Sequence, residues 1–171
     1  MKALVVYESM FGATQSAAEA IGDGLAPHGS VRVVEVGALA EESGGAVGED
    51  VDLLVVGGPT HAFSMSRANT REDARKEGLP IISTGPGVRE WLDGVRIPGG
   101  VAWAAFDTKV STPPLPGAAS KSITKELRKL GGRMAAKPMS FAVQGKAGGL
   151  LDGELERAKA WGEQLGRTAG T

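Results

Sequence analysis

Residues Ser9–Thr14 place two hydroxyl side chains and a glycine between an apolar run and a segment with helical spacing. Lys2–Tyr7, before them, has the composition of a buried strand, and Thr14–Ala26, after them, predicts a helix with one apolar stripe. At such a turn, unpaired backbone N–H groups, hydroxyls and the positive end of the helix dipole can bind an anion. We therefore interpret this turn as a candidate phosphate site formed by Ser9, Met10, Phe11, Gly12, Ala13 and Thr14.

The charge of the turn narrows the kind of phosphate that it could bind. No Lys or Arg lies between Glu8 and Thr14, whereas a nucleotide P-loop ends in a Gly-Lys-Ser/Thr sequence whose lysine binds the β- and γ-phosphates. This absence favours a terminal monophosphate held by uncharged donors. The alternative is an ordinary strand-to-helix turn in which Ser9 or Thr14 caps the helix.

Two further polar segments follow apolar runs. Gly57–Phe63 comes after Val51–Val56, and its glycines and proline predict a sharp strand end. Phe106–Lys109 comes after the apolar run that begins at Val101. Parallel strands end at one edge of a sheet, and ligands bind there. The candidate residues from these segments are Pro59, Thr60, His61, Ala62, Phe63, Phe106, Asp107 and Thr108.

Strand and helix signals alternate along the whole chain, which is typical of a parallel sheet with helices on both faces. The expected strands are Lys2–Tyr7, Val31–Val36, Val51–Val56, Val101–Phe106 and Pro138–Val143. The expected helices are Thr14–Ala26, Ala38–Ser43, Val88–Asp93, Ala118–Leu130 and Gly153–Leu165. We predict an α/β fold, a three-layer doubly wound five-stranded parallel sheet of order 2-1-3-4-5.

Residues 1–171 are expected to form one domain with a long loop insertion at about 64–84, in which Asn69–Glu77 is a candidate helix. We expect Trp91, Trp103 and Trp161 to lie in the core rather than at a ligand.

Composition excludes several classes of function. The chain has no cysteine and only two histidines, which excludes disulfides and thiolate catalysis and argues against a histidine metal site. A net charge of −1 without a basic run gives no basis for binding nucleic acid. No apolar run approaches the ~20 residues of a membrane span, and the N-terminus lacks a signal-peptide pattern. The expected location is therefore cytoplasmic.

At these three segments the chain resembles the flavodoxin family, on Tyr7–Thr14, Gly57–Thr60 and Phe106–Thr108. Family members usually show a hydroxyl-x-hydroxyl-Gly-x-Thr turn, and here Phe11 replaces the second hydroxyl, so one phosphate donor is lost. The Ser-Met-aromatic-Gly form is similar to turns in quinone-reductase and menaquinone-linked branches of the superfamily. The resemblance implies FMN as the cofactor.

The resemblance also implies roles for single residues. Thr60 would bond the ribityl chain, His61 would lie near the pyrimidine end or N5, Phe63 would stack on the ring, and Asp107 would accept from N3–H. The alternative for His61 is an exposed loop histidine, and that for Phe63 is packing under the long loop. The alternative for Asp107 is a turn in which its carboxylate bonds its own backbone. Many electron-carrying flavodoxins cover one face of the flavin ring with a tyrosine in the loop after the fourth strand. The only tyrosine here, Tyr7, lies in the first strand, so the resemblance implies that one ring face is open.

The favoured function is an FMN-binding, flavodoxin-like electron-transfer protein, without a catalytic side chain, that works with a redox partner protein or a small-molecule electron donor or acceptor. The first alternative is an FMN-dependent NAD(P)H:quinone-type reductase or dehydrogenase, and the second is a flavin-free binding domain on the same fold. The 64–84 segment carries cations that could attract an anionic donor, partner or substrate, or could simply be solvated; they are Arg67, Arg71, Arg75 and Lys76.

A phospho-acceptor site of the response-regulator type is excluded. It needs two acidic residues directly after the first strand and an Asp at the end of the third. The chain offers only Glu8 and no Asp in Gly57–Thr60.

Overall fold

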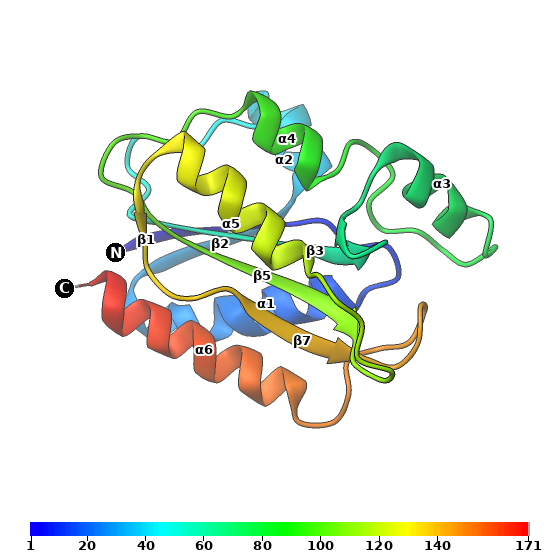
Figure 1. Ribbon diagram of the computed structural model, residues 1–171. Helices are drawn as coiled ribbons and strands as arrows, with labels where there is room; N and C mark the ends of the chain where they lie inside the picture. Colours follow the sequence, from blue (N-terminus) through cyan, green and yellow to red (C-terminus); the bar gives the residue numbers. More distant parts are fainter. Residues whose placement is uncertain (171) are drawn as a thin grey trace.

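The N-terminal apolar run forms a central strand of the sheet. In the computed structural model, which describes residues 1–170, β1 (Lys2–Tyr7) pairs in parallel with β2 (Ser30–Glu35) on one side and with β3 (Leu53–His61) on the other. β5 (Ala102–Val110) continues the sheet beyond β3, again in parallel. The three inner strands therefore end at one edge of the sheet, as the sequence predicted (Figure 1).

Two short strands share the last position of the sheet. β6 (Arg133–Met134) pairs with the start of β5, and β7 (Met139–Val143) pairs with its end. A further two-residue strand, β4 (Ser64–Met65), pairs antiparallel with the end of β3. The path β2-β1-β3-β5 followed by β6 and β7 confirms the predicted order 2-1-3-4-5, and the described residues form seven strands rather than five because of the split and the hairpin.

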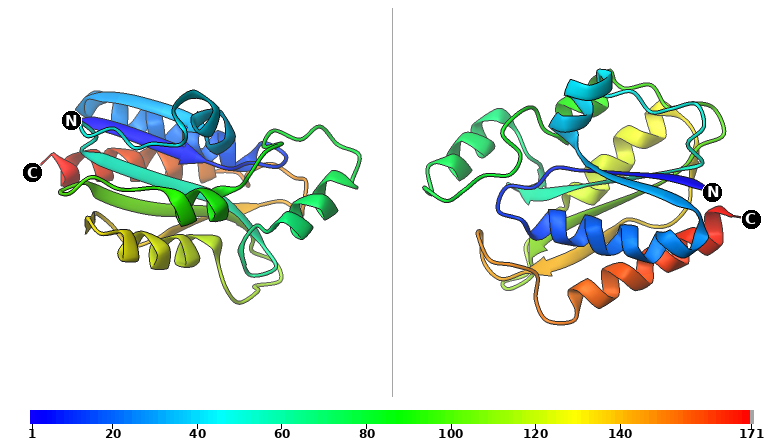
Figure 2. Two further views of the ribbon diagram at one scale, coloured as in Figure 1. Left: turned by 90° about the horizontal axis from the view of Figure 1, so that it is seen from above. Right: turned by 180° about the vertical axis from the view of Figure 1, so that it is seen from behind.

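Helices cover both faces of the sheet. α1 (Ala13–Leu25) and α6 (Glu154–Ala169) pack on one face, while α2 (Val36–Ser43), α4 (Val88–Gly94) and α5 (Ala119–Leu130) cover the other (Figures 1 and 2). This is the predicted three-layer arrangement. A short 3-10 helix joins α1 to β2. None of the helices in residues 1–170 combines the length and the apolar character needed to cross a bilayer.

The alternation of side chains in β1 explains why its sequence is a continuous apolar run. Ala3 and Val5 pack into the core beneath α1 and α6, whereas Leu4 and Val6 pack into the core beneath α2, α4 and α5. A strand buried on both faces has no solvent side on which a polar residue would be favoured. The three tryptophans are also buried, as predicted, at Trp91, Trp103 and Trp161.

β3 and β5 are longer than predicted. β3 ends at His61 and not at Val56, and β5 ends at Val110 and not at Phe106. β3 stays paired with β5 through Pro59↔Thr108, where β1 has already ended and proline on a strand with one free side is tolerated. Gly57 is required for packing within this pair, since a Cβ there would lie 2.1 Å from Cζ of Phe106.

The segment predicted as a long loop at 64–84 contains β4 and α3 (Ala68–Arg75), close to the candidate helix Asn69–Glu77. Its far end returns to the sheet, where Ile82 N–H donates to Met10 O at 3.0 Å and Ser83 N–H donates to Ser9 O at 2.8 Å. α3 therefore lies beyond the carboxyl ends of the strands, away from both helical layers (Figures 1 and 2).

Candidate functional site

A pocket of about 270 Å³ lies at the carboxyl ends of β1, β3, β5 and β7. It includes residues from all three segments singled out in the sequence: Ser9, Met10, Phe11, Ala13, Thr14, Pro59, Thr60, His61, Ala62 and Thr108. The other candidates, Gly12, Phe63, Phe106 and Asp107, do not line it. Parallel pairing brings these distant segments together, because strands that run in one direction end at one edge.

The β1–α1 turn (Ser9–Thr14) is shaped by a glycine and a serine. Gly12 is the N-cap of α1, with a φ of 108°, and no side chain caps the helix. Ser9 Oγ instead accepts the N–H of Gly12 at 3.1 Å, which closes the turn on itself. The alternative in which Ser9 or Thr14 caps α1 is therefore not what the structure has.

Several backbone donors of this turn have no acceptor in the part of the chain that the structure describes. They are the N–H groups of Met10, Phe11, Ala13 and Thr14, and the first helical bond of α1 is Ser16 N–H to Gly12 O. Unpaired N–H groups at a helix start need an outside acceptor and carry partial positive charge. They lie on residues that line the pocket, so the turn is equipped to bind an anion.

The hydroxyl of Thr14 joins the turn to β5. Thr14 Oγ1 and Thr108 Oγ1 lie 2.7 Å apart, and both residues are buried. Two hydroxyls hold two hydrogens, and the bond between them uses one. The other hydrogen is left for an acceptor in the pocket, which both residues line.

Two candidate residues bind the start of α5. Thr60 Oγ1 accepts the N–H of Ala119 at 2.9 Å, and Asp107 Oδ2 accepts the N–H of Ser120 at 2.8 Å. Thr60 keeps its hydroxyl hydrogen, which it can donate into the pocket. Asp107 bonds the backbone of a helix thirteen residues later rather than that of its own turn, and its Oδ1 has no partner among the described residues.

The aromatic candidates lie in different environments. Phe106 is fully buried and packs edge-on against Phe141 and Trp161, with ring centroids 6.1 Å and 6.4 Å away. Phe63 is 53% exposed at the tip of the β3–β4 hairpin. Of the described aromatic residues, Phe11 alone lines the pocket. Stacking of Phe63 on a bound ring stays a prediction.

His61 is a strand residue and not the exposed loop residue of the alternative interpretation. It ends β3, is partly buried and lines the pocket. Its Nδ1 lies 3.1 Å from the hydroxyl of Thr70 in α3. Burial lowers the pKa of His61 below its usual value of 6.5, and the positive charge of Arg71 lowers it further. The imidazole is therefore neutral at neutral pH.

The pocket also includes residues that the sequence interpretation missed. From α3 and its end come Thr70, Asp73, Ala74 and Glu77, and from β5, β7 and the turn after β7 come Lys109, Val110, Val143, Gly145, Lys146 and Gly148. The signal was present, because the 64–84 segment follows β3 and the glycine-rich turn follows β7. The rule that predicted the other contacts, position after a strand end, applies to them equally.

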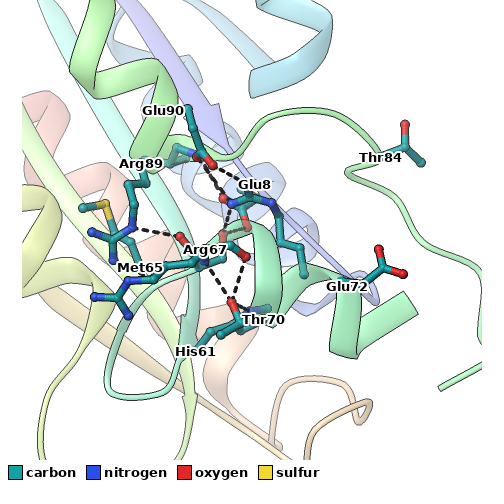
Figure 3. A network of polar contacts seen from close by, with 12 residues as sticks. Glu8, His61, Met65, Arg67, Thr70, Glu72, Thr84, Arg89 and Glu90 are labelled. Atoms are coloured by element: carbon teal, nitrogen blue, oxygen red, sulfur yellow. Dashed lines mark hydrogen bonds and ion pairs between the residues drawn. The ribbon is translucent and has the colours of Figure 1, made fainter. Parts of the chain in front are cut away.

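A buried network of charged side chains adjoins the β1–α1 turn. Glu8 is 1% exposed, and its carboxylate accepts from Val88 N–H at 2.8 Å and from Ser66 Oγ at 2.5 Å. Arg71 donates to Ser66 Oγ at 2.8 Å and forms an ion pair with Glu90. Figure 3 shows Glu8 and Glu90 of this network. Burial raises the pKa of Glu8, against the opposing effect of these hydrogen bonds and of Arg71.

Most cations of the 64–84 segment already have partners. Arg71 is 4% exposed inside the network, Arg75 pairs with Glu72, and Lys76 pairs with Asp73. The expectation that Arg71 could offer its charge to a ligand or partner is wrong, because that charge is held between β4 and α4. Among the described residues, no partner is found for the guanidinium of Arg67.

No protein-family model and no curated protein matches the sequence. Solved structures do match. A flavodoxin from the domain Archaea is 22% identical with a TM-score of 0.64, and the match covers 100% of both chains. Oxidised flavodoxin 2 from Bacillus cereus is 19% identical with a TM-score of 0.67, covering 98% of this chain and 99% of that one.

A flavodiiron protein from Giardia intestinalis is 20% identical with a TM-score of 0.60, and the match covers 98% of this chain but 36% of that longer one. The resemblance that three short segments suggested thus extends over the whole chain in three dimensions. From its strand order, its layers and these matches, the protein has the flavodoxin-like fold.

Proposed function

We propose that the chain binds FMN in this pocket and transfers electrons. The observation that carries the proposal is that the N–H groups of Met10, Phe11, Ala13 and Thr14 have no acceptor among residues 1–170, while these residues line a pocket at the carboxyl ends of β1 and β3. A ligand with a terminal phosphate and a planar body suits such a site. Flavodoxins among the structural neighbours have the same fold, at low sequence identity.

In this proposal the chain binds and orients the cofactor. The β1–α1 turn would hold the phosphate through its backbone N–H groups, with the hydroxyl pair Thr14–Thr108 adding a donor. Thr60 would donate its remaining hydrogen to the ribityl chain. Bound flavin supplies the redox chemistry, so no side chain has to act as a catalyst. Contacts of Phe63 and Asp107 with the ring belong to the same hypothesis.

The exposed end of the pocket would exchange electrons with a redox partner protein or with a small molecule. No contact in the described residues favours the reductase alternative over this one, since the cations that could attract a phosphate-bearing donor are mostly paired. The flavin-free alternative predicts a colourless protein that binds no flavin.

Titration with FMN and with riboflavin tests the proposal, because the two ligands differ only in the phosphate. Quenching of flavin fluorescence should give an FMN affinity at least about tenfold above that for riboflavin, the effect of one or more charge-assisted hydrogen bonds. Equal affinities would remove the β1–α1 turn from the site, and no binding of either ligand would support the flavin-free domain. Anaerobic addition of NADH or NADPH to the FMN-loaded protein distinguishes the enzyme, in which the flavin colour bleaches quickly, from a carrier.

A further inference from the structure

The contact between His61 and Thr70 ties the pocket wall to α3. His61 ends β3, and Thr70 lies in the first turn of α3, with the hydroxyl Oγ1 3.1 Å from Nδ1 (Figure 3). The same hydroxyl accepts the N–H of Arg67 at 2.8 Å, and it donates its own hydrogen to Arg67 O at 3.0 Å. It therefore contacts three polar groups.

The hydrogens available at this hydroxyl favour one tautomer of His61. If Thr70 donates its single hydrogen to Arg67 O, it can accept from both Arg67 N–H and His61 Nδ1–H, which makes three hydrogen bonds. If it donates to Nδ1 instead, the bond to Arg67 O is lost and two remain. The arrangement with the larger number of bonds places the imidazole hydrogen on Nδ1.

The other ring nitrogen of His61, Nε2, has no hydrogen-bond partner in the part of the chain that the structure describes. Among residues 1–170, Asp107 Oδ1 is the only side-chain nitrogen or oxygen atom that is both buried and without a partner, so Nε2 is not a buried atom. Nε2 is therefore reached by solvent, and His61 lines the pocket. A neutral imidazole with its hydrogen on Nδ1 presents a lone pair at Nε2.

We propose that Thr70 fixes His61 as a hydrogen-bond acceptor of the pocket, so that Nε2 selects a ligand that presents an N–H or O–H group. The proposal rests on the proposed function where the ligand is FMN, which carries donors of both kinds. Uptake of a proton from solvent by Nε2 converts the acceptor into a donor. Binding of such a ligand then weakens as the pH falls.

Burial lowers the pKa of His61, and the positive charge of Arg71 in α3 lowers it further. The charged residues that line the pocket with His61 are Asp73 and Glu77 from α3 and its end, Lys109 from β5 and Lys146 from the turn after β7. Loss of acceptor character is therefore expected below the usual imidazole range, and not at neutral pH.

Nitrogen-15 NMR of the imidazole in the ligand-free protein tests the tautomer directly. We expect the chemical shifts of a protonated Nδ1 and an unprotonated Nε2 at neutral pH. Thr70→Val, which removes the hydroxyl, should move the ring toward the opposite tautomer or a mixture, and Thr70→Ser should restore the shifts of the natural protein. A hydrogen on Nε2 in the natural protein would overturn the proposal without any bearing on flavin binding.

Affinity for FMN between about pH 8 and about pH 4.5 tests the functional part, because this range extends well below the usual imidazole pKa. His61→Gln is the matched control, because it keeps a polar group near the position of Nε2 but does not titrate, and the phosphate titrates identically in both proteins. We expect the natural protein to lose roughly fivefold more affinity than His61→Gln over this range. Parallel pH profiles would overturn the proposal, whereas absence of FMN binding by both proteins would overturn the proposed function instead and leave the NMR result to decide on the tautomer.

Discussion

The β1–α1 turn and the network around Glu8 are neighbours in the sequence, but they use polar groups in opposite ways. The turn contains no charged side chain between Ser9 and Thr14, and four of its backbone N–H groups have no acceptor in the described chain. The network buries a carboxylate and a guanidinium, and Glu8 and Arg71 both have partners within the chain. Glu8 directly precedes the turn, which begins at Ser9.

This difference shows which kind of group marks a binding site. A buried charge is stable only when it is paired, and a paired charge has little left to offer a ligand. Unpaired amides at a helix start are less costly in a solvated pocket, and they remain available. In this protein Glu8 and Arg71 hold α3 and α4 against the end of β1, and the uncharged turn is equipped for binding.

The largest effect is expected from breaking the network. Arg71→Met leaves the buried Ser66–Glu8 pair without its cation and also removes the partner of Glu90, whose side chain is 40% exposed. Because solvent reaches Glu90, the expected loss is about 2–3 kcal/mol, less than for an ion pair buried on both sides. Because burial already raises the pKa of Glu8, proton uptake by Glu8 should reduce the loss toward the lower end.

Urea denaturation at neutral pH measures this loss. Arg75→Met, in an exposed pair with Glu72, is the matched control and should change the free energy of unfolding by less than about 1 kcal/mol. Equal losses in the two variants would mean that the network contributes no more than a surface ion pair.

An intermediate effect is expected at the junction between the turn and β5. Thr14→Val and Thr108→Val each remove one hydroxyl of the buried pair, which should weaken FMN binding by about 1–2 kcal/mol. Because both changes break the same bond, the double variant should lose less affinity than the two single losses added together.

Fluorescence titration of the three variants with FMN provides the measurement. Thr124→Val, a buried threonine in α5 that donates to Ser120 O and does not line the pocket, controls for the general effect of the substitution. Unchanged FMN affinity in both single variants would remove the pair from the phosphate site and leave the backbone N–H groups as its donors.

The smallest effect concerns pH and the buried carboxyl group. Since burial raises the pKa of Glu8 above 4.5 in the folded protein, the folded state keeps this proton to a higher pH than the unfolded state does. The contribution of Glu8 to stability should therefore decrease as the pH rises from about 4.5 to its folded pKa, and stay constant above it.

The free energy of unfolding across this range, compared between the natural protein and Glu8→Gln, isolates the contribution of Glu8. The natural protein should lose stability relative to Glu8→Gln as the pH rises from about 4.5 to the folded pKa of Glu8, and the difference should then stay constant. Glu156→Gln, at an exposed position, reports the effect of removing a surface carboxylate. A constant difference between the natural protein and Glu8→Gln would contradict a raised pKa.

Sequence patterns predicted most of what depends on local periodicity. The apolar run Lys2–Tyr7 and the stripe of α1 gave the strand and the helix within one residue at most ends, because each pattern is repeated over several residues. Strand ends were less predictable. His61 and Thr108 looked like loop residues, but both lie in strands. His61 pairs with Ser64 of β4, and Thr108 of β5 pairs with β3 and β7.

Partners that lie far apart in the sequence were beyond such patterns. Nothing near Glu8 indicates that Ser66 and Val88 N–H will bond its carboxylate, or that Arg71 will be buried beside them. In the same way, Asp107 has the sequence context of a turn residue but bonds the start of α5. The contacts of Glu8 depend on how the end of β1 meets β4 and α4, and the contact of Asp107 depends on how β5 meets α5.

By itself the sequence determined the alternation of strands and helices, the parallel sheet and the uncharged turn after β1, since residue type and spacing act locally along the chain. Only the tertiary structure decided which polar groups are free. It gave Arg71 and Glu8 each a partner inside the protein. It left Nε2 of His61 and four N–H groups of the β1–α1 turn without partners among the described residues. The physical reason is that a hydrogen bond or ion pair depends on distance in space, which the packing of strands and helices sets.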